Sequence, residues 1–322
     1  MQNTNQDQFS LSAPTIVITG GAGLVGQNLV IELAEKCPCN IVVLDKSASN
    51  CAVLRKLQPN IAVYCCDLSN PGPWDEYFKD ASAVVLLHAQ IGSNDKNQFI
   101  KNNIDATRFI LDAIDKYKIK RVVHISSSVV ESVADDLYTQ TKKMQEEFVL
   151  QSPISSVVLR PTLMFGWFDR KHLGWLSRFM KKVPVFPIPG DGKYLRQPLY
   201  VRDFCKMIVH CIANADLTGV YNISGFEKIF YIDLIHEIKR ASGAKVWIVK
   251  IPYSLFHFLL RLWSVFDKNP PFTASQLEAL VAGDEFEVID WPSLFHVQPT
   301  PLNQALKETF QHPIYSKVKL TF

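Results

Sequence analysis

The feature of this sequence that most constrains its fold is a glycine-rich segment near the N-terminus, Thr15–Val30 (TIVITGGAGLVGQNLV). A short β-branched run is followed at once by glycines and then by a helix-like pattern, which predicts the order strand, tight turn, helix. Glycine permits such a turn and lets a pyrophosphate approach the main-chain N–H groups at the helix N-terminus. The segment therefore predicts a dinucleotide site, and its expected binding residues are Gly20, Gly23, Leu24, Val25 and Gly26.

An acidic residue lies where a dinucleotide turn needs one. The apolar run NIVVLD ends in Asp45, about 20 residues beyond the glycines, a position where a carboxylate holds the ribose 2′-hydroxyl. Because a carboxylate repels a 2′-phosphate, Asp45 favours NAD over NADP, although the neighbouring Lys46 would weaken that preference. The sequence thus predicts an NAD site that includes Asp45 and Lys46.

Composition is typical of a soluble globular protein. With 322 residues, of which 48% are hydrophobic and 20% charged, the chain can bury a full core in one large domain or two. The net charge of +3 is small and the basic residues are dispersed, so a nucleic-acid partner is not expected. The seven cysteines show no paired C-x-x-C spacing, so we expect no metal site and interpret them as reduced thiols of a cytoplasmic protein.

Apolar and amphipathic segments alternate through the first half of the chain. Strands are expected at residues 61–69, 81–92, 119–128 and 155–166, and helices at 99–117 and 137–150. Such alternation predicts an α/β fold, a doubly wound parallel (Rossmann) sheet with right-handed crossovers. Ligands of these sheets bind at the carboxyl ends of the strands, where Asp45, Asp67, His88 and the serines at 126–128 fall.

Prolines and glycines interrupt the pattern after Gly166, and the second half of the chain is more irregular. We expect residues 1–13, which are polar and lack the features of a signal peptide, to form a tail. Residues 14–166 would form the NAD-binding domain, and residues 167–322 a smaller C-terminal substrate-binding lobe interleaved with it.

One segment of the C-terminal half, Tyr253–Phe266 (YSLFHFLLRLWSVF), is strongly apolar. A membrane-spanning helix needs about 20 apolar residues, and this shorter run is interrupted by His257 and Arg261. We therefore favour a buried or surface-docked amphipathic helix over contact with a membrane.

A tyrosine and a lysine four residues apart, Tyr138 and Lys142, are the candidate catalytic groups. A helix would place both side chains on one face. A neighbouring ammonium and an oxidised nicotinamide would lower the phenol pKa from about 10 toward neutrality, so that Tyr138 could act as a general base. A serine at the end of the preceding strand, Ser127 or Ser128, would hold the substrate oxygen. The alternative is a surface pair that is four apart by chance, against which the upstream dinucleotide turn argues.

These motifs follow one another as in the extended short-chain dehydrogenase/reductases, and residues 14–240 resemble the nucleotide-sugar epimerase/dehydratase branch of that family. The matching segments are TGGAGLVG (19–26), NNIDATRFILDA (102–113), LRPTLMFG (159–166), GDGKYLR (190–196) and YNISG (221–225). The resemblance implies an NAD-dependent enzyme whose small-molecule substrate is a nucleotide sugar, with Lys142 on the cofactor ribose and Asp67–Leu68 on the adenine. It also implies that Leu87, His88 and Ala89 lie beside the cofactor.

The same resemblance assigns Arg196 to the diphosphate of a nucleotide sugar. This arginine follows a Gly-Asp-Gly turn, and a guanidinium can bind a diphosphate bidentately. A surface salt bridge is an equally good interpretation. Relatives pair through two helices, here 99–117 and 137–150, which would give a two-fold homodimer, although nothing in the sequence requires one.

The sequence departs from the family pattern near the expected active site. His88 stands where the family has a small residue; it either fills a gap beside the nicotinamide ribose or, less favoured, takes part in catalysis. Only nine residues separate Ser128 from Tyr138, so the substrate loop is shortened, and Ser128 aligns better than Ser127 with the family's serine. The two residues after Ser128 are valines, in places where the dehydratase branch has an Asp–Glu pair, which disfavours dehydration.

Three functions remain open. The favoured one is an NAD-dependent epimerase or oxidoreductase of a nucleotide-linked sugar, in which Tyr138 removes a hydroxyl proton while hydride passes to NAD. The shortened loop and the apolar segment 253–266 favour a second, a dehydrogenase or reductase of a sterol-like or other apolar alcohol. The third is a dinucleotide-binding assembly subunit without turnover, which would account for His88 and the unusual residues after the serines.

Overall fold

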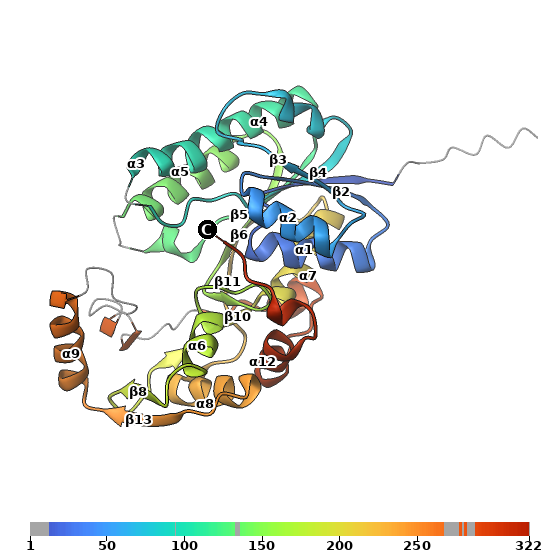
Figure 1. Cartoon of the computed structure of the whole chain (residues 1–322). Coiled ribbons are helices and arrows are strands. Elements are labelled where there is room, and N and C mark those ends of the chain that lie inside the picture. Colours follow the sequence, from blue (N-terminus) through green and yellow to red (C-terminus); the bar gives the residue numbers. More distant parts are fainter. Residues whose placement is uncertain are drawn as a thin grey trace, which may run out of the picture.

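A seven-stranded parallel sheet forms the centre of the larger lobe (Figure 1). The computed structural model describes residues 13–93, 95–132, 136–266, 277, 278, 280, 281 and 287–321; the expected tail, apart from its last residue, lies outside them. The strand order is β11-β6-β5-β4-β1-β2-β3, with every pair parallel. The strands are β1 (Thr15–Thr19), β2 (Asn40–Asp45), β3 (Ala62–Cys65), β4 (Ala81–Leu86), β5 (Arg121–Ile125), β6 (Ser155–Pro161) and β11 (Gly219–Ile223). The order reverses between β1 and β4, which confirms the doubly wound sheet.

Helices cover both faces of this sheet, as the continuous apolar strands predict. One face carries α1 (Leu24–Lys36), α2 (Ala48–Leu57) and α7 (Val201–Ala213); the other carries the short 3-10 helix η1 (Pro73–Phe78), α4 (Ala106–Lys116) and α5 (Leu137–Gln151). Successive residues of β1 point to opposite layers: Ile16 and Ile18 pack in the first core, and Val17 packs in the second.

Several strands end earlier than their apolar pattern suggested. Strand β3 ends before Asp67, β4 ends before His88, and β5 ends before the serines at 126–128. The expected helix at 99–117 is divided into α3 (Lys96–Phe99), the π-helix η2 (Ile100–Asp105) and α4. The strands expected from the apolar pattern were too long because apolar side chains continue past the last hydrogen bond between strands. These side chains lie in the loops that line the ligand-binding edge of the sheet.

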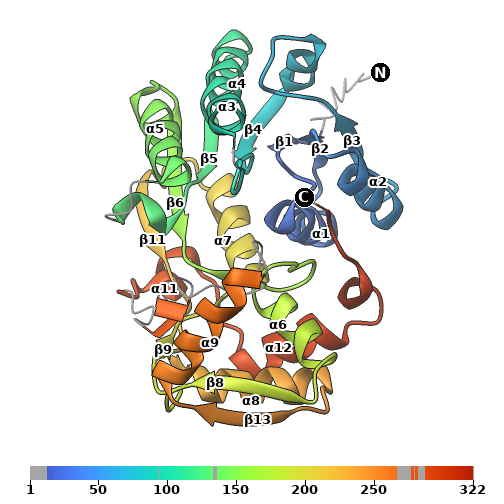
Figure 2. The ribbon, with the colours of Figure 1, turned by 60° about the vertical axis from the view of Figure 1, so that its left-hand side comes forward.

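The smaller lobe is built from the second half of the chain (Figure 2). Its core lies among α6 (Leu173–Met180), α8 (Tyr231–Ser242), α12 (Leu302–Gln311) and the parallel pair β8 (Val185–Pro189) and β13 (Trp247–Ile251). Shorter elements are β7 (Met164–Phe165) with β10 (Leu199–Tyr200), β9 (Leu195–Arg196) with β12 (Ile229–Phe230), and the 3-10 helix η4 (Tyr315–Lys317). Helix α11 (Trp291–Phe295) packs with α7 in the core of the larger lobe. Because α7 and β11 pack in the larger lobe, the chain crosses between the lobes more than once.

The apolar segment of the C-terminal half forms helix α9 (Tyr253–Phe266). Leu260 is buried, but Leu255, Phe258 and Leu262 are exposed, so of the two expected forms, buried or surface-docked, the structure has the surface-docked one. Among the described residues, no helix is long and apolar enough to cross a membrane. The same part of the chain contains no group of three or more His, Cys, Asp or Glu side chains placed to hold a metal ion.

Candidate active site

The glycine-rich turn joins β1 to α1 and has no room for side chains. Gly20 has a φ of +68°, and a Cβ on it would lie 2.6 Å from the Cα of His88. A Cβ on Gly26 would lie 2.3 Å from the carbonyl oxygen of Gly21. The N-cap residue of α1, Gly23, makes no side-chain capping bond, so the first N–H groups of the helix are available to an anion. This geometry fits a pyrophosphate.

Asp45 connects the end of β2 to this turn. Its Oδ2 accepts a hydrogen bond from the N–H of Ala22 at 3.0 Å, and its Oδ1 accepts one from the N–H of Ser47 at 2.8 Å. Burial raises the pKa of Asp45 even though both hydrogen bonds favour its ionised form. Lys46 beside it is exposed. The carboxylate thus lies at the end of β2 beside the turn and stabilises the turn itself.

The other residues assigned to the cofactor lie around the same edge of the sheet. They are Leu24 and Val25 in the first turn of α1, Asp67 and Leu68 after β3, and Leu87, His88 and Ala89 after β4. Asp67 is exposed and accepts a hydrogen bond from the N–H of Ser69 at 2.9 Å. Leu68 is buried in the core beneath the sheet, so its side chain has a packing role.

Tyr138 lies in the first turn of α5, and its phenol is hydrogen-bonded to Ser127. Burial raises the pKa of Tyr138, and the hydrogen bond with Ser127 opposes that rise. Ser127 directly precedes the 3-10 helix η3 (Ser128–Glu131). The structure therefore brings Tyr138 to Ser127, the serine that the sequence placed second, whereas Ser128 begins η3. Residues 133–135 of the shortened loop lie outside the described residues.

Lys142 lies one turn further along α5 and is fully buried. Its Nζ donates to the carbonyl oxygen of Ile125 at 3.0 Å and to Oε1 of Gln145 at 2.5 Å. Burial lowers the pKa of Lys142 to about 7, against the opposing effect of the Glu146 charge. The ammonium thus donates to Ile125 and Gln145, and the assistance that Lys142 would give to Tyr138 stays a prediction.

His88 lies between the end of β1 and α5. Its Nδ1 is 2.8 Å from Oγ1 of Thr19, and its Nε2 is 2.9 Å from Oγ1 of Thr107. The side-chain nitrogen of Gln145 is 3.1 Å from Nε2, which assigns Nε2 as the acceptor and the proton to Nδ1. Burial, aided by the nearby charge of Lys142, lowers the pKa of His88 to about 3. The imidazole is thus neutral, and Gln145 connects it to the lysine.

Sequence reasoning missed the polar side chains that hold α5 in place. Glu146 accepts a hydrogen bond from Oγ of Ser126 at 2.5 Å and forms an ion pair with Arg160 of β6. Gln145 and Glu146 follow Lys142 by three and four positions, so helical spacing would have placed them beside it. Glu146 fixes α5 against the carboxyl ends of β5 and β6, which positions the helix that carries Tyr138.

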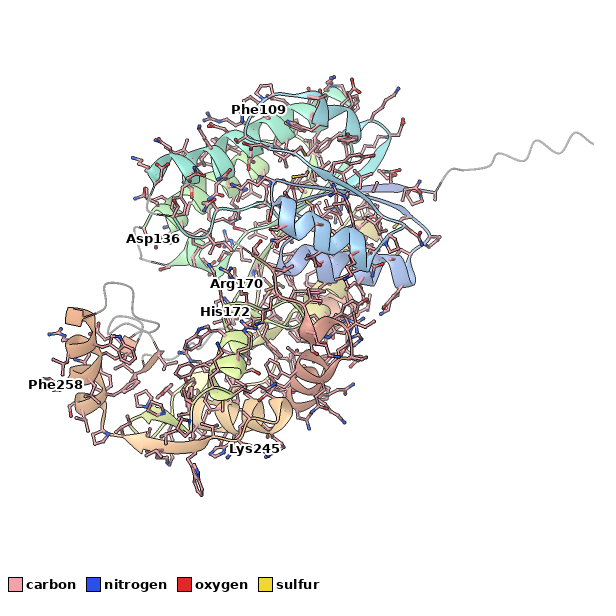
Figure 3. The ribbon with its side chains drawn as sticks, viewed as in Figure 1. Phe109, Asp136, Arg170, His172, Lys245 and Phe258 are labelled. Carbon is pink, nitrogen blue, oxygen red and sulfur yellow. The ribbon has the colours of Figure 1, made fainter. Side chains whose placement is uncertain are left out.

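Basic residues lie on the side of the smaller lobe. Arg196 is on β9, and its Nη2 donates to the carbonyl oxygen of Leu280 at 2.9 Å. Figure 3 shows Arg170 and His172 between the two lobes. They belong to a loop that begins at Phe168, whose φ of +68° is rare for a residue with a side chain and is a form of strain that often occurs at functional sites. The sequence had assigned no role to Arg170 or His172.

Comparisons with known proteins agree with this fold. A model of the NAD dependent epimerase/dehydratase family matches residues 16–224. Sterol-4-alpha-carboxylate 3-dehydrogenase, decarboxylating, from Schizosaccharomyces pombe is 24% identical over 91% of this chain and 96% of the relative. NADH dehydrogenase (ubiquinone) 1 alpha subcomplex subunit 9, mitochondrial, from Rattus norvegicus is 24% identical over 75% of this chain and 67% of the relative.

A solved structure shares the fold. UDP-glucuronic acid 4-epimerase from Bacillus cereus, in complex with NAD, superposes with a TM-score of 0.69. The match has 22% sequence identity and covers 92% of this chain and 95% of that chain.

Proposed function

The chain belongs to the NAD dependent epimerase/dehydratase family, and from that membership we propose that it is an NAD-dependent epimerase or oxidoreductase of a nucleotide-linked sugar. The observation that carries the proposal is the hydrogen bond between Tyr138 and Ser127 beyond the carboxyl end of β5. It supports a proton-accepting phenol beside a hydroxyl that can hold a substrate oxygen. The class of substrate is supported by the fold shared with a UDP-glucuronic acid 4-epimerase.

The residues around the turn fit NAD. The uncapped N-terminus of α1 would hold the pyrophosphate, and Asp45 would bind the ribose hydroxyls. Asp67 would contact the adenine from the loop after β3. A carboxylate at position 45 supports NAD rather than NADP because it repels a 2′-phosphate. When bound, NAD would accept hydride from the substrate carbon and, in an epimerase, return it.

Side chains of this protein would accept and hold the proton of the substrate hydroxyl. Tyr138 would accept the proton of the substrate hydroxyl, while Ser127 would donate a hydrogen bond to the same oxygen and hold it in place. Lys142 would have to leave Gln145 to bind the ribose, and its ammonium would then favour the phenolate. In the free protein the phenol therefore stays protonated, and ligand binding completes the base.

One lobe would bind the cofactor and the other the substrate. Residues 14–166 would form the NAD-binding domain, with α7 and β11 completing its layers, and residues 167–322 the substrate lobe. Arg196 would bind the substrate diphosphate, and Arg170, which lies between the lobes (Figure 3), is a second candidate for that role. A homodimer through α4 and α5 stays a prediction.

Two other functions have specific support. The sterol dehydrogenase relative favours an apolar alcohol as substrate. The relative named as a subunit of NADH dehydrogenase, together with the donation of Lys142 to Gln145, favours a dinucleotide-binding subunit without turnover.

Mass spectrometry of the natively purified chain, followed by assays, separates these functions. The proposal predicts bound NAD, and conversion of UDP-glucose, UDP-N-acetylglucosamine or UDP-glucuronic acid to its 4-epimer or to an oxidised product. NADH formation with a 3-hydroxysterol, and none with the sugars, would favour the apolar alcohol. Bound NAD without turnover of either class would favour the assembly subunit.

A further inference from the structure

Helix α9 lies at the periphery of the smaller lobe (Figure 1) and exposes an apolar stripe. Leu260 faces the protein and is buried, whereas Phe258 is 60% exposed and Leu262 is 46% exposed. Figure 3 labels Phe258 on the side of α9 that faces away from the larger lobe. The stripe consists of Leu255, Phe258, Leu259, Leu262 and Trp263, which recur with helical spacing.

This pattern is the reverse of an ordinary surface helix. Such a helix buries its apolar stripe and presents polar side chains to water, but α9 packs through one side and has a second apolar side that the described residues leave exposed. Contiguous apolar surfaces of this kind mark sites of interaction with proteins or membranes. The stripe is therefore a candidate surface for binding a protein or a membrane.

Within the part of the chain that the structure describes, most charged side chains near the stripe are basic. The segment Tyr253–Phe266 contains no Asp or Glu, and its charged residue Arg261 is exposed at the edge of the stripe. Lys250, which precedes the helix, is also exposed. Glu278 is exposed as well, and it pairs with His257 of α9 at 3.2 Å. Among the described residues, the rim of the stripe thus carries more basic than acidic side chains, which suits an anionic surface.

The strand that leads to α9 adds an exposed aromatic residue. Trp247 of β13 is 78% exposed, and Val249, two positions later on the same face of the strand, is exposed as well. Tryptophan is enriched where proteins meet the headgroup region of a membrane. Residues 247–263 therefore combine aromatic, aliphatic and basic side chains in one continuous segment.

We propose that α9 docks on an anionic lipid surface, with Leu255, Phe258 and Leu262 inserted and Arg261 and Lys250 at the level of the headgroups. A helix of 14 residues is about 21 Å long, too short to span a bilayer but suited to lie in its interface. A second copy of the chain fits less well, since it would bring the basic rims of two stripes together. The inference does not depend on the proposed function.

Co-sedimentation of the full chain with lipid vesicles tests this docking. The wild-type chain is expected to bind phosphatidylcholine vesicles that contain phosphatidylglycerol, and to bind pure phosphatidylcholine more weakly. The double variant Phe258→Ser/Leu262→Ser should bind at least about tenfold more weakly, because it removes two inserted side chains. The matched control is Leu150→Ser/Ile314→Ser, at positions with 46% and 56% exposure elsewhere on the surface, and it should bind like the wild type.

A second measurement keeps the test valid if the double variant misfolds. Brominated lipids should quench the tryptophan fluorescence of the wild type more than that of Trp263→Phe, which preserves an apolar aromatic side chain. Arg261→Gln should reduce the preference for anionic vesicles. The proposal is overturned if the wild type binds neither kind of vesicle, or if both double variants bind equally. A wild-type dimer in light scattering that Phe258→Ser/Leu262→Ser converts to a monomer would also overturn it, in favour of a second copy.

Discussion

The side-chain nitrogen of Gln145 lies 3.1 Å from Nε2 of His88, and the side-chain oxygen of Gln145 accepts a hydrogen bond from the ammonium of Lys142 at 2.5 Å. One amide therefore joins the most unusual residue of the site to the lysine of the Tyr–Lys pair. Burial lowers both pKa values, that of His88 to about 3 and that of Lys142 to about 7. The histidine is consequently a neutral hydrogen-bonding partner that influences where the lysine points.

Replacement of His88 by Asn should change how stability depends on pH. Between about pH 3 and about pH 6.5 the unfolded chain binds a proton on this histidine and the folded chain does not, so the free energy of unfolding rises with pH over that window. Asn cannot titrate, so the wild type should gain up to about 1.4 kcal/mol per pH unit relative to His88→Asn. Urea denaturation across this range measures the difference. His236→Asn, on the exposed surface of α8, is the control, and parallel curves for wild type and His88→Asn would contradict the expectation.

Removal of the Tyr138 hydroxyl should slow turnover strongly and preserve the cofactor site. Tyr138→Phe loses the proton acceptor, and we expect kcat to fall by about 10²-fold to 10⁴-fold. NAD affinity, measured by calorimetry, should stay close to that of the wild type. Tyr253→Phe, at an exposed position of α9, should leave kcat unchanged. Wild-type turnover by Tyr138→Phe would rule out the proposed mechanism.

The two candidate serines should differ in their effect. Ser127 hydrogen-bonds Tyr138 and lowers its pKa, so Ser127→Ala should raise that pKa and move the acidic limb of the kcat–pH profile, on which activity rises as the phenol ionises, to higher pH. The loss of a donor to the substrate oxygen should also lower kcat by about 10²-fold. Ser128→Ala should behave like the wild type in both respects. The reverse result would show that Ser128, which the sequence comparison favoured, holds the substrate oxygen instead of Ser127.

A methyl group in the turn should disrupt the cofactor site. Gly20→Ala forces a side chain into a backbone conformation with φ +68° and places its Cβ 2.6 Å from the Cα of His88. We expect a loss of about 1–3 kcal/mol in the free energy of unfolding, measured by thermal denaturation. We also expect weaker NAD binding, measured by calorimetry. Gly92→Ala is the matched control, because a Cβ there meets no atom within 4 Å. Equal effects of the two substitutions would refute the close-packing argument.

Local patterns made much of the fold predictable. The β-branched run, the glycines and the helix that follows are neighbours in sequence, so β1, the turn and α1 could be derived without tertiary information. The same is true of Tyr138 and Lys142, whose spacing places them along one helix. Partners that come from distant segments could not be derived in this way. His88 contacts Thr19 and Thr107, and no local pattern shows which side of α9 the rest of the chain leaves uncovered.

The choice between Ser127 and Ser128 also depended on tertiary structure. Both are small hydroxyl residues after the same strand, and they differ only in how the chain turns after β5. Because η3 begins at Ser128, the chain changes direction there and Ser127 is the residue that reaches Tyr138. The order of residues in the sequence alone could not show this turn.

The position of Asp45 has a consequence for anyone who would redesign the coenzyme preference of this chain. Its two carboxylate oxygens accept the N–H groups of Ala22 and Ser47. A smaller or basic residue that admitted NADP would thus leave both main-chain donors without their acceptor and loosen the phosphate-binding loop. A successful exchange of coenzyme therefore requires a compensating substitution that restores an oxygen at the same place.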